Sequence, residues 1–571
     1  MGEKTINPNK KPKSKKKKIL VEHKPIVIGG IIAAVAIAGI VGGIVLFLGE
    51  KKIGGTFIFG YGGGLDRIDP LIANLYDPII IASIAEPLFT EYYNQTGKYY
   101  ENSPHLAEEG TWSPDGLNFT CTLKKGVEFH DGTKFNASAV KWNFDRLHNL
   151  LVNMSIYGVD YLWYHPDGTL ILNRTEIIND YTVRFVLNRP FVPFRALLTI
   201  PHAYILSPAS TPEDRFLDAF TEKLIGTGPY IYESNVVYVN TTIIKNKNYW
   251  GTPKPVMDTY VFIPYSYQES NEHFFAKETD YAVGNDSLLE EYSADSTIVV
   301  DDFVEHGFDY LGMNNKRINT TMRKAISYAL NYTSILELAD SLSHGSNIRC
   351  RSPLSLETLY SNWEDFDVPY YNITKARQTL KDVNWPGTTD LTANNIITIG
   401  NEWETIANMT PLMTLNISYI FGGWNWLEEL SYIIVDNLKQ IGVKVENLPL
   451  TYEDHWDNVF ASKIDLFWLG WLIDYNDPSN TLNAIFSTQL EGWNNFQQTN
   501  DSIVQGWLDQ GTVETNPFNR SRLYYDIQRE LIERVYPVAW LYSNVWFDVY
   551  RSNVRGWGIW GAGSLRYIYR V

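Results

Sequence analysis

The uncharged, mostly apolar run from Ile26 to Leu48 constrains this chain more than any other feature. As a helix its 23 residues rise about 1.5 Å each, which is enough to cross the hydrocarbon core of a bilayer once. Nine lysines precede the run, and the lysine-rich flank of a membrane helix stays in the cytoplasm. We therefore expect a cytoplasmic tail over residues 1–24, a single-pass membrane anchor over residues 25–48 and a linker over residues 49–54, followed by an extracellular body.

A cleaved signal peptide is the competing interpretation of this run. Signal peptides usually have a shorter apolar region that ends at a small-residue cleavage site, whereas Phe47-Leu-Gly-Glu-Lys-Lys follows here. We therefore favour an uncleaved anchor in the cell membrane. The net charge changes sign at this boundary, because residues 1–52 carry +8 of a total of −17 and leave −25 on the exterior body. A body this acidic repels nucleic acid.

The stretch Leu469-Gly-Trp-Leu-Ile-Asp-Tyr-Asn-Asp-Pro-Ser479 places two carboxylates and two aromatic rings directly after an apolar strand. That strand is predicted over Asp465–Gly470, and Asp477-Pro478 is predicted to break any regular element. Asp474 and Tyr475 should therefore lie on a loop at the carboxyl end of the strand, where ligands bind in open α/β sheets. The alternative is an ordinary Asp-Pro turn beside a core tryptophan.

A βαβ unit is predicted just before this stretch. Thr414–Ile420 reads as a strand, Trp426–Gln440 as an amphipathic helix that ends at Gly442, and Val443–Glu446 as the next strand. The sheet should be parallel and should include the strand before Asp474. Trp424 would then also lie near the carboxyl ends, although packing between lobes is an alternative role for it.

Other local patterns predict further elements of the first half. Thr56–Phe59 and Phe119–Leu123 read as strands, and Ile79–Tyr92 reads as a helix broken near Glu86-Pro87. Asn136 is a good N-cap for the helix that follows it. His130-Asp-Gly132 could suggest catalysis, but Asp-Gly is strong turn chemistry and no nucleophile is paired with it, so a hairpin turn is the favoured interpretation.

Five stretches in register resemble the family 5 solute-binding proteins of ABC transporters, which include peptide, oligopeptide and nickel binders. The stretches are Gly470–Pro478; Trp112–Val140 with the following Lys141–Leu147; Gly226–Tyr230 with Asn248–Gly251; Leu311–Asn315 with Met322–Leu330; and Leu438–Glu446. The resemblance covers roughly residues 55–571, and five matches in order are far more specific than one.

The resemblance implies an α/β fold, the two-lobed clamshell of class II periplasmic binding proteins with an extra subdomain in the first lobe. At 571 residues the chain also exceeds what one core holds. The expected parts are a first lobe over 55–308 with an inserted subdomain at about 96–205, a second lobe over 309–538, and a return to the first lobe over 539–571. Strand crossings near Val304–Leu311 and Val535–Leu541 would form the hinge.

By the same resemblance, Asp474 corresponds to the carboxylate that grips the α-ammonium of a peptide, and Trp471 to an aromatic wall of the pocket. The full set of candidate ligand-binding residues is Asp474, Trp471, Tyr475, Asn476, Trp424, Asn425 and Glu86. The expected function is the capture of a peptide or oligopeptide for ABC permease subunits in the membrane, by a monomer without cofactor. An oligosaccharide ligand is the alternative, since 18 Trp and 37 Tyr could also line a cleft for sugar rings. Nickel is weaker, because ten scattered His and two Cys show no metal-ligand spacing.

Two other classes of function stay open at this point. The body contains no His-Glu-x-x-His, Gly-x-Ser-x-Gly or Cys-x-x-Cys, so we expect no enzyme, although the carboxylates of a surface glycosidase would leave no such trace. A solute sensor uncoupled from transport is the other alternative, but the cytoplasmic tail is too short to hold a signalling domain.

Fourteen Asn-x-Ser/Thr sequons exceed what chance supplies at this composition, which fits a glycosylated cell surface. Together with a family confined mainly to prokaryotes, the sequons suggest an archaeal envelope. Cys121 and Cys350 are the only cysteines. Two buried free thiols are favoured over a disulfide between them.

Overall fold

The computed structural model describes most of the chain after the expected linker, and residues 50–571 form one compact unit. The described ranges are 54–61, 65–72, 78–94, 99–153, 160–341, 347–397, 401–422, 425–490, 494–558 and 564–571. The expected tail and anchor, residues 1–48, lie outside them. Within these ranges no helix is long and apolar enough to cross a membrane.

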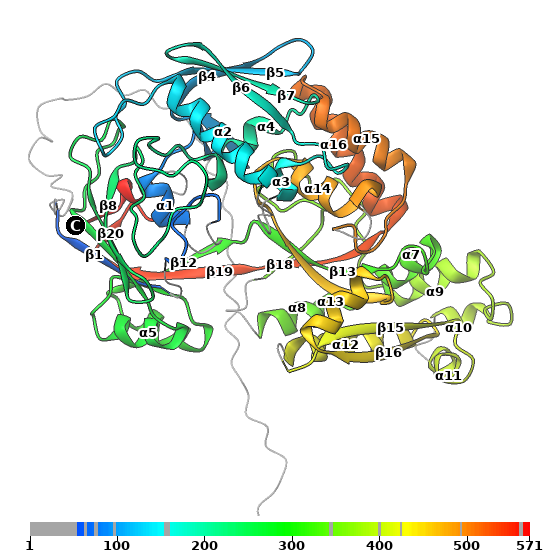
Figure 1. The fold of residues 1–571 in the computed structure, drawn as a ribbon. Coiled ribbons are helices and arrows are strands. Elements are labelled where there is room, and N and C mark those ends of the chain that lie inside the picture. The colour runs from blue at the N-terminus through cyan, green and yellow to red at the C-terminus, as the bar shows by residue number, and fades with distance from the viewer. Residues whose placement is uncertain are drawn as a thin grey trace, which may run out of the picture. The chain divides into compact units, whose positions relative to one another are not determined.

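One half of the body is built on a seven-stranded mixed sheet (Figure 1). β1 lies at its centre, parallel to β10 and β11, and the remaining pairs are antiparallel. The strands in order are β12 (Ile298–Val304), β19 (Val545–Arg551), β11 (Tyr281–Val283), β1 (Thr56–Tyr61), β10 (Thr259–Pro264), β9 (Asn240–Lys245) and β8 (Tyr230–Val236). The strand predicted over Thr56–Phe59 is thus confirmed, because Phe57 and Phe59 alternate into the core of this half.

The other half is built on a six-stranded mixed sheet. Its order is β14 (Ile348–Arg349), β18 (Val538–Ser543), β13 (Gly307–Met313), β17 (Leu466–Leu472), β15 (Met413–Ile420) and β16 (Val443–Leu450). β15 is parallel to both β16 and β17, and α12 (Asn425–Lys439) connects β15 to β16. The predicted βαβ unit and its parallel third strand are confirmed, whereas the expectation that the whole sheet is parallel is wrong, because β13 runs antiparallel to β17 and β18. Gly442 follows the helix at φ +76°, a conformation that glycine adopts without strain.

A four-stranded antiparallel sheet and short helices form a subdomain with its own core. Its strands in order are β4 (Ala107–Trp112), β5 (Asn118–Leu123), β7 (Thr182–Leu187) and β6 (Leu172–Asn179). The helices are α2 (Ala137–Asn153), α3 (Asp160–Trp163) and α4 (Phe194–Leu197), and α2 packs on β6. Asn136 accepts a hydrogen bond from the Ala139 N–H at 3.0 Å and so caps α2 as predicted. The turn predicted at His130-Asp-Gly132 is confirmed too, with Gly132 at φ +83°.

The helix predicted over Ile79–Tyr92 is wrong in its second half. α1 (Pro78–Ile84) ends before Glu86, and β2 (Phe89–Asn94) forms a hairpin with β3 (Tyr99–Pro104). Pro87 lacks an N–H and cannot continue a helix, and pairing with β3 then decides the conformation of the residues that follow.

The remaining elements flank the two large sheets. They are α5 (Tyr267–Phe275), α6 (Leu289–Ala294), α7 (Thr320–Ala329), α8 (Tyr332–Asp340), α9 (Ile373–Asp382), α10 (Ala393–Ile397), α11 (Asn401–Met409), α13 (Tyr452–Phe460), α14 (Pro478–Phe486), α15 (Ser502–Val513), α16 (Pro517–Glu530) and the pair β20 (Val554–Arg555) and β21 (Tyr569–Arg570). Asn319, Asn331 and Asn372 cap α7, α8 and α9 with their side chains. All three asparagines begin sequons. Their role as helix caps is a structural reason for an asparagine at each of these positions.

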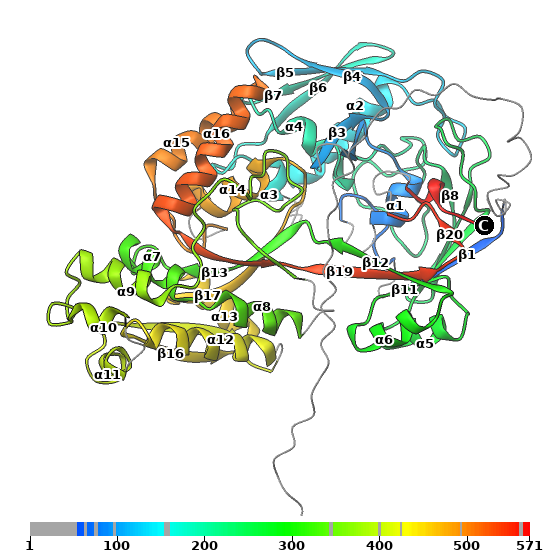
Figure 2. The same cartoon turned by 180° about the vertical axis from the view of Figure 1, so that it is seen from behind.

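The chain crosses between the two large sheets twice, and the crossings lie side by side (Figures 1 and 2). β12 continues into β13 through Glu305 and His306, and β18 continues into β19 through Asn544. The Glu305 N–H donates to the Asn544 carbonyl at 2.9 Å, and the Asn544 amide donates back to the Glu305 carboxylate at 2.8 Å. The first crossing falls within the expected range, whereas the second lies a few residues beyond it because Val538–Tyr542 pairs with β13.

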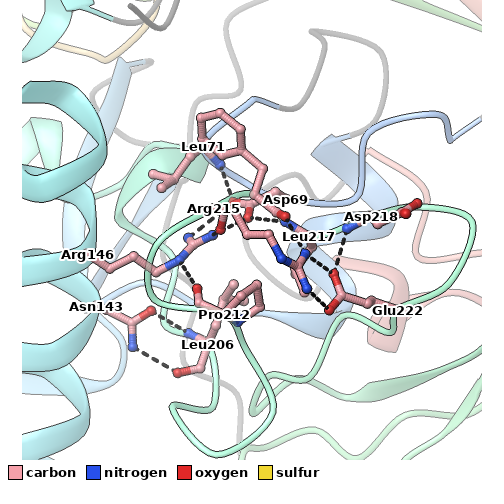
Figure 3. A network of polar contacts seen from close by, with 11 residues as sticks. Asp69, Leu71, Asn143, Arg146, Leu206, Pro212, Arg215, Leu217, Asp218 and Glu222 are labelled. Atoms are coloured by element: carbon pink, nitrogen blue, oxygen red, sulfur yellow. Dashed lines mark hydrogen bonds and ion pairs between the residues drawn. The ribbon is translucent and has the colours of Figure 1, made fainter. Parts of the chain in front are cut away.

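A buried ion pair fixes the subdomain helix α2 to the rest of its half (Figure 3). Asp69 and Arg146 are 0% and 3% exposed, and they form a two-pronged contact. The Asp69 carboxylate also accepts from the Leu217 N–H at 2.9 Å, and Arg146 donates to the Pro212 carbonyl at 2.7 Å. Each charge is therefore both paired and hydrogen-bonded, as burial of a charge requires.

Candidate ligand-binding site

Asp474 lies on the loop between β17 and α14, at the carboxyl end of β17 as predicted. The neighbouring side chain of Asn480 holds it in two ways: its Oδ1 accepts from the Asp474 N–H at 3.0 Å, and its Nδ2 donates to Asp474 Oδ2 at 2.9 Å. Asn480 is 5% exposed and cannot reorient freely, whereas Asp474 is only half-buried. The carboxylate is thus pre-oriented by a rigid partner.

Asp477 and Pro478 begin a helix, and the prediction that they interrupt regular structure is wrong. Pro478 is the first residue of α14, where a missing N–H costs nothing, and Asp477 caps the helix by accepting from the Ser479 N–H at 3.0 Å. Asp477 also forms a buried bidentate pair with Arg520, with N–O distances of 2.6 and 2.8 Å. Although burial opposes it, the Asp477 carboxylate raises the pKa of Arg520 above its ordinary value. The second carboxylate of the stretch therefore anchors the loop.

Gly470 and Trp471 lie on β17 opposite Asp309 and Phe308 of β13. A Cβ on Gly470 would lie 2.5 Å from Asp309 Oδ1, so the position has room for a larger residue only if the buried Asp309 carboxylate shifts. Burial, followed by the nearby Glu305, raises the pKa of Asp309 well above its usual range. Trp471 is half-buried opposite Phe308, and its indole N–H has no hydrogen-bond partner among the described residues.

Tyr475 and Asn476 point toward the first half of the chain. Tyr475 is 7% exposed and packs in the core of the subdomain. Asn476 is 2% exposed; its amide donates to the Tyr100 carbonyl at 2.9 Å and its Oδ1 accepts from the Leu359 N–H at 3.0 Å. The Asn476 N–H donates to the Glu91 carboxylate at 3.0 Å. These two residues therefore join the halves in this structure.

Glu86 is fully buried and its carboxylate is occupied by protein groups. Oε1 accepts from the Tyr249 hydroxyl at 2.7 Å and lies 2.8 Å from Nε2 of His105. Oε2 accepts from the Thr227 hydroxyl at 2.8 Å and the Trp250 indole at 2.9 Å. Burial alone would raise its pKa, but these contacts lower it, so the group stays ionised. This arrangement argues against a ligand role for Glu86 and gives the Gly-Thr-Gly-Pro-Tyr and Asn-Tyr-Trp-Gly stretches a structural purpose.

The last two candidates are Trp424 and Asn425. Trp424 lies outside the described residues. Asn425 is exposed as the first residue of α12, at the carboxyl end of the strand beside β17.

The sequence reasoning missed Asn480, Arg520 and a polar cluster beside Asn476, which consists of Glu91, His306 and Glu357. Asn480 could have been found, because it lies six positions after Asp474 and can reach back to it across the helix start. No pattern in the sequence near Arg520 indicated that it pairs with Asp477. In the cluster, Nε2 of His306 lies 2.8 Å from the Glu357 carboxylate, and burial raises the pKa of Glu91 although Asn476 opposes this.

A comparison with known protein families identifies the family of this chain. Residues 101–493 match the model of the bacterial extracellular solute-binding proteins, family 5. The chain belongs to family 5 of the extracellular solute-binding proteins. Its relatives include the glutathione-binding protein GsiB of Pectobacterium atrosepticum, 26% identical over 67% of this chain and 68% of the relative. The heme-binding protein A of Haemophilus influenzae is 24% identical over 77% of this chain and 79% of the relative.

Solved family 5 structures share the fold. The periplasmic binding protein DppA of Helicobacter pylori, in complex with the peptide STSA, has a TM-score of 0.67 at 23% identity over 91% of this chain and 99% of its own. The substrate-binding protein CtaP of Listeria monocytogenes has a TM-score of 0.73 at 18% identity over 91% of this chain and all of its own. The expected α/β periplasmic-binding-protein fold is thus confirmed for the described body.

Cysteines and metal ligands add little to the site. Cys121 and Cys350 are buried free thiols, as predicted, and burial raises the pKa of Cys350 to about 12. Among the residues that the structure describes, no group of three His, Cys, Asp or Glu side chains could hold a metal ion.

Proposed function

We propose that this family 5 protein is the membrane-anchored receptor of an ABC importer, which captures a peptide through its free amino terminus and delivers it to the permease subunits. The observation that carries the proposal is the Asp474 carboxylate, held by Asn480 at the carboxyl end of β17. A carboxylate in a closing cleft forms a charge-assisted hydrogen bond with an ammonium group, about twice as strong as a neutral bond.

The connections between the halves support capture by closure. Among the residues that the structure describes, the two large sheets are joined through Glu305–His306 and through Asn544, and Asn476 joins the loop after Asp474 to the hairpin β2–β3. A ligand held at Asp474 would lie beside these contacts and favour the closed state.

The ligands named for the relatives support peptide over oligosaccharide. DppA was solved with the peptide STSA, and a dipeptide-binding protein of Pseudoalteromonas, with a TM-score of 0.66, was solved with Met-Leu. The sequence relatives are named for glutathione and heme.

Substitution of Asp474 by Asn tests the proposed contact, because it keeps the shape and removes the charge. Affinity should fall at least about tenfold for free-amine peptides, which corresponds to ~1.4 kcal/mol, and hardly at all for N-acetylated ones. Asp457→Asn, on the exposed face of α13, is the matched control and should bind like the wild type. Titration calorimetry with a peptide mixture and with cello- and malto-oligosaccharides measures this. Equal losses for both kinds of peptide, or binding of the sugars alone, would contradict the peptide contact.

We infer from the sequence that residues 25–48 anchor the receptor in the cell membrane as a single-pass monomer, with the tail cytoplasmic and the body extracellular. Alkaline extraction of membranes should leave the full chain in the pellet, and protease added to intact cells should remove the body. Release of the chain by alkaline extraction would contradict the anchor.

A further inference from the structure

A cavity of about 780 Å³ lies between the subdomain and the helices that follow β17. In both views α3 lies beside α14 (Figures 1 and 2). The Val192 N–H donates to the Thr512 carbonyl at 2.7 Å and so bridges the two walls. The cavity is within the range of about 300–1,000 Å³ typical of small-molecule sites.

The subdomain wall is mainly apolar. It comprises the end of α2, α3, the segment between α3 and β6, and the loop after β7, with Leu151, Leu162, Ile171 and Phe191. The rings of His165 and Phe191 form a T-shaped pair, with 5.6 Å between ring centroids. This wall can hold an aromatic or branched aliphatic group.

The opposite wall is formed by one face of α14 and the end of α15. Asn480, Asn483, Ala484 and Ser487 line the cavity, and their spacing of three and four residues places them on one side of the helix. The Oδ1 atom of Asn483 is buried with no hydrogen-bond partner in the described part of the chain. An unpaired buried acceptor is costly, and rotation of this amide toward a ligand N–H or O–H would satisfy it.

The charges of the lining disfavour an anionic occupant. Arg189 forms an ion pair with Asp167, and Asp509 accepts from the Gln505 amide at 2.7 Å. Burial lowers the pKa of His165, so its ring is neutral at neutral pH. None of these lining groups offers an unpaired cation to an anionic ligand.

The cavity and the candidate peptide site share Asn480, whose side chain lines the cavity and also holds Asp474. We propose that this cavity is a second ligand site, which takes an uncharged molecule with an aromatic or branched aliphatic body and amide or hydroxyl groups, and that its occupancy favours closure. A molecule that touches both walls binds best when they are together, so it stabilises the closed arrangement. The second site stands independently of the proposed function, whereas its coupling to peptide binding rests on it.

The test uses the full chain and two probes that differ by one charge, N-acetyltryptophanamide and N-acetyltryptophan. Calorimetry should show the amide binding at least tenfold more tightly than the carboxylate. Ala484→Trp and Asn483→Phe each fill the cavity and should reduce binding of the amide at least tenfold. Gln510→Trp, on the exposed side of α15, is the control for the introduced ring and should leave it unchanged.

Coupling is tested by titrating a free-amine peptide with and without saturating amide, which should tighten peptide binding at least threefold. Asp474→Asn should weaken the peptide but leave the amide in place, so failure of the peptide site and failure of the cavity are distinguishable. The absence of amide binding, binding that survives both cavity variants, or displacement of the amide by peptide one for one would each overturn the second site. If Ala484→Trp loses its native circular dichroism, Asn483→Phe decides.

Discussion

Replacing Arg520 by Met should destabilise the body by about 3–5 kcal/mol, the cost of leaving one partner of a buried ion pair without the other. Arg520 and Asp477 are each 4% exposed and pair through bonds of 2.6 and 2.8 Å. The variant also removes the 2.8 Å bond from Arg520 Nε to the Gly511 carbonyl. Asp477 would keep only the Ser479 N–H among its hydrogen bonds described above. Urea unfolding followed by fluorescence and circular dichroism measures the change, and coincident transitions establish that one free energy describes it.

Two further variants distinguish the pair from a general effect of losing an arginine. Arg534→Met removes an arginine that is 45% exposed and pairs with Asp501, and it should cost under about 1 kcal/mol. The double variant Asp477→Asn/Arg520→Met should be more stable than Arg520→Met alone, because Asn still caps α14 and leaves no buried charge. A cost for Arg520→Met no larger than that of Arg534→Met, or a double variant no more stable than Arg520→Met, would refute the reasoning.

Three more outcomes are expected. Asn480→Ala should weaken peptide binding severalfold while leaving the fold intact, because Asp474 loses two hydrogen bonds of about 3 Å; calorimetry with unchanged circular dichroism checks this, and unchanged affinity would contradict it. Gly470→Ala should lower the free energy of unfolding by about 1–3 kcal/mol, since its Cβ meets Asp309 at 2.5 Å; a neutral result in urea unfolding would be inconsistent with the close approach. Burial raises the pKa of Asp548 from 3.8 to about 6, so its stabilising contribution is fully present below pH ~4 and is lost as pH rises through ~6. Asp548→Asn should therefore gain ~2–3 kcal/mol relative to the wild type between pH 4 and 7, and parallel stability curves would contradict this.

Elements with a strong local pattern could be predicted from the sequence. The βαβ unit, the strand before Asp474 and the cap at Asn136 depend on residues within a few positions of one another. The position of Asp474 at a strand end followed from the same patterns. Its ligand role stays a prediction, as does that of Trp471.

The roles of Glu86, Tyr475 and Asn476 depended on partners that no local pattern reveals. Glu86 is held by residues up to 164 positions away, and Asn476 by residues up to 385 positions away. A conspicuous polar residue near a strand end can serve packing as readily as binding. The asparagines of several sequons likewise have a structural role. At least five of the fourteen sequons begin with an asparagine that caps a helical turn, namely Asn136, Asn285, Asn319, Asn331 and Asn372.

The paired crossings at Glu305 and Asn544 have a kinetic consequence. Two hydrogen-bonded strands resist sliding past one another but bend across their common face, so under the proposed capture by closure the body would open in one collective motion. A molecule enclosed between the halves would then have to wait for that motion before it could leave. The residence time of that molecule would therefore depend on how often the paired crossings bend. A substitution at Asn544 should change the association and dissociation rates of the ligand together, while affecting the equilibrium constant less.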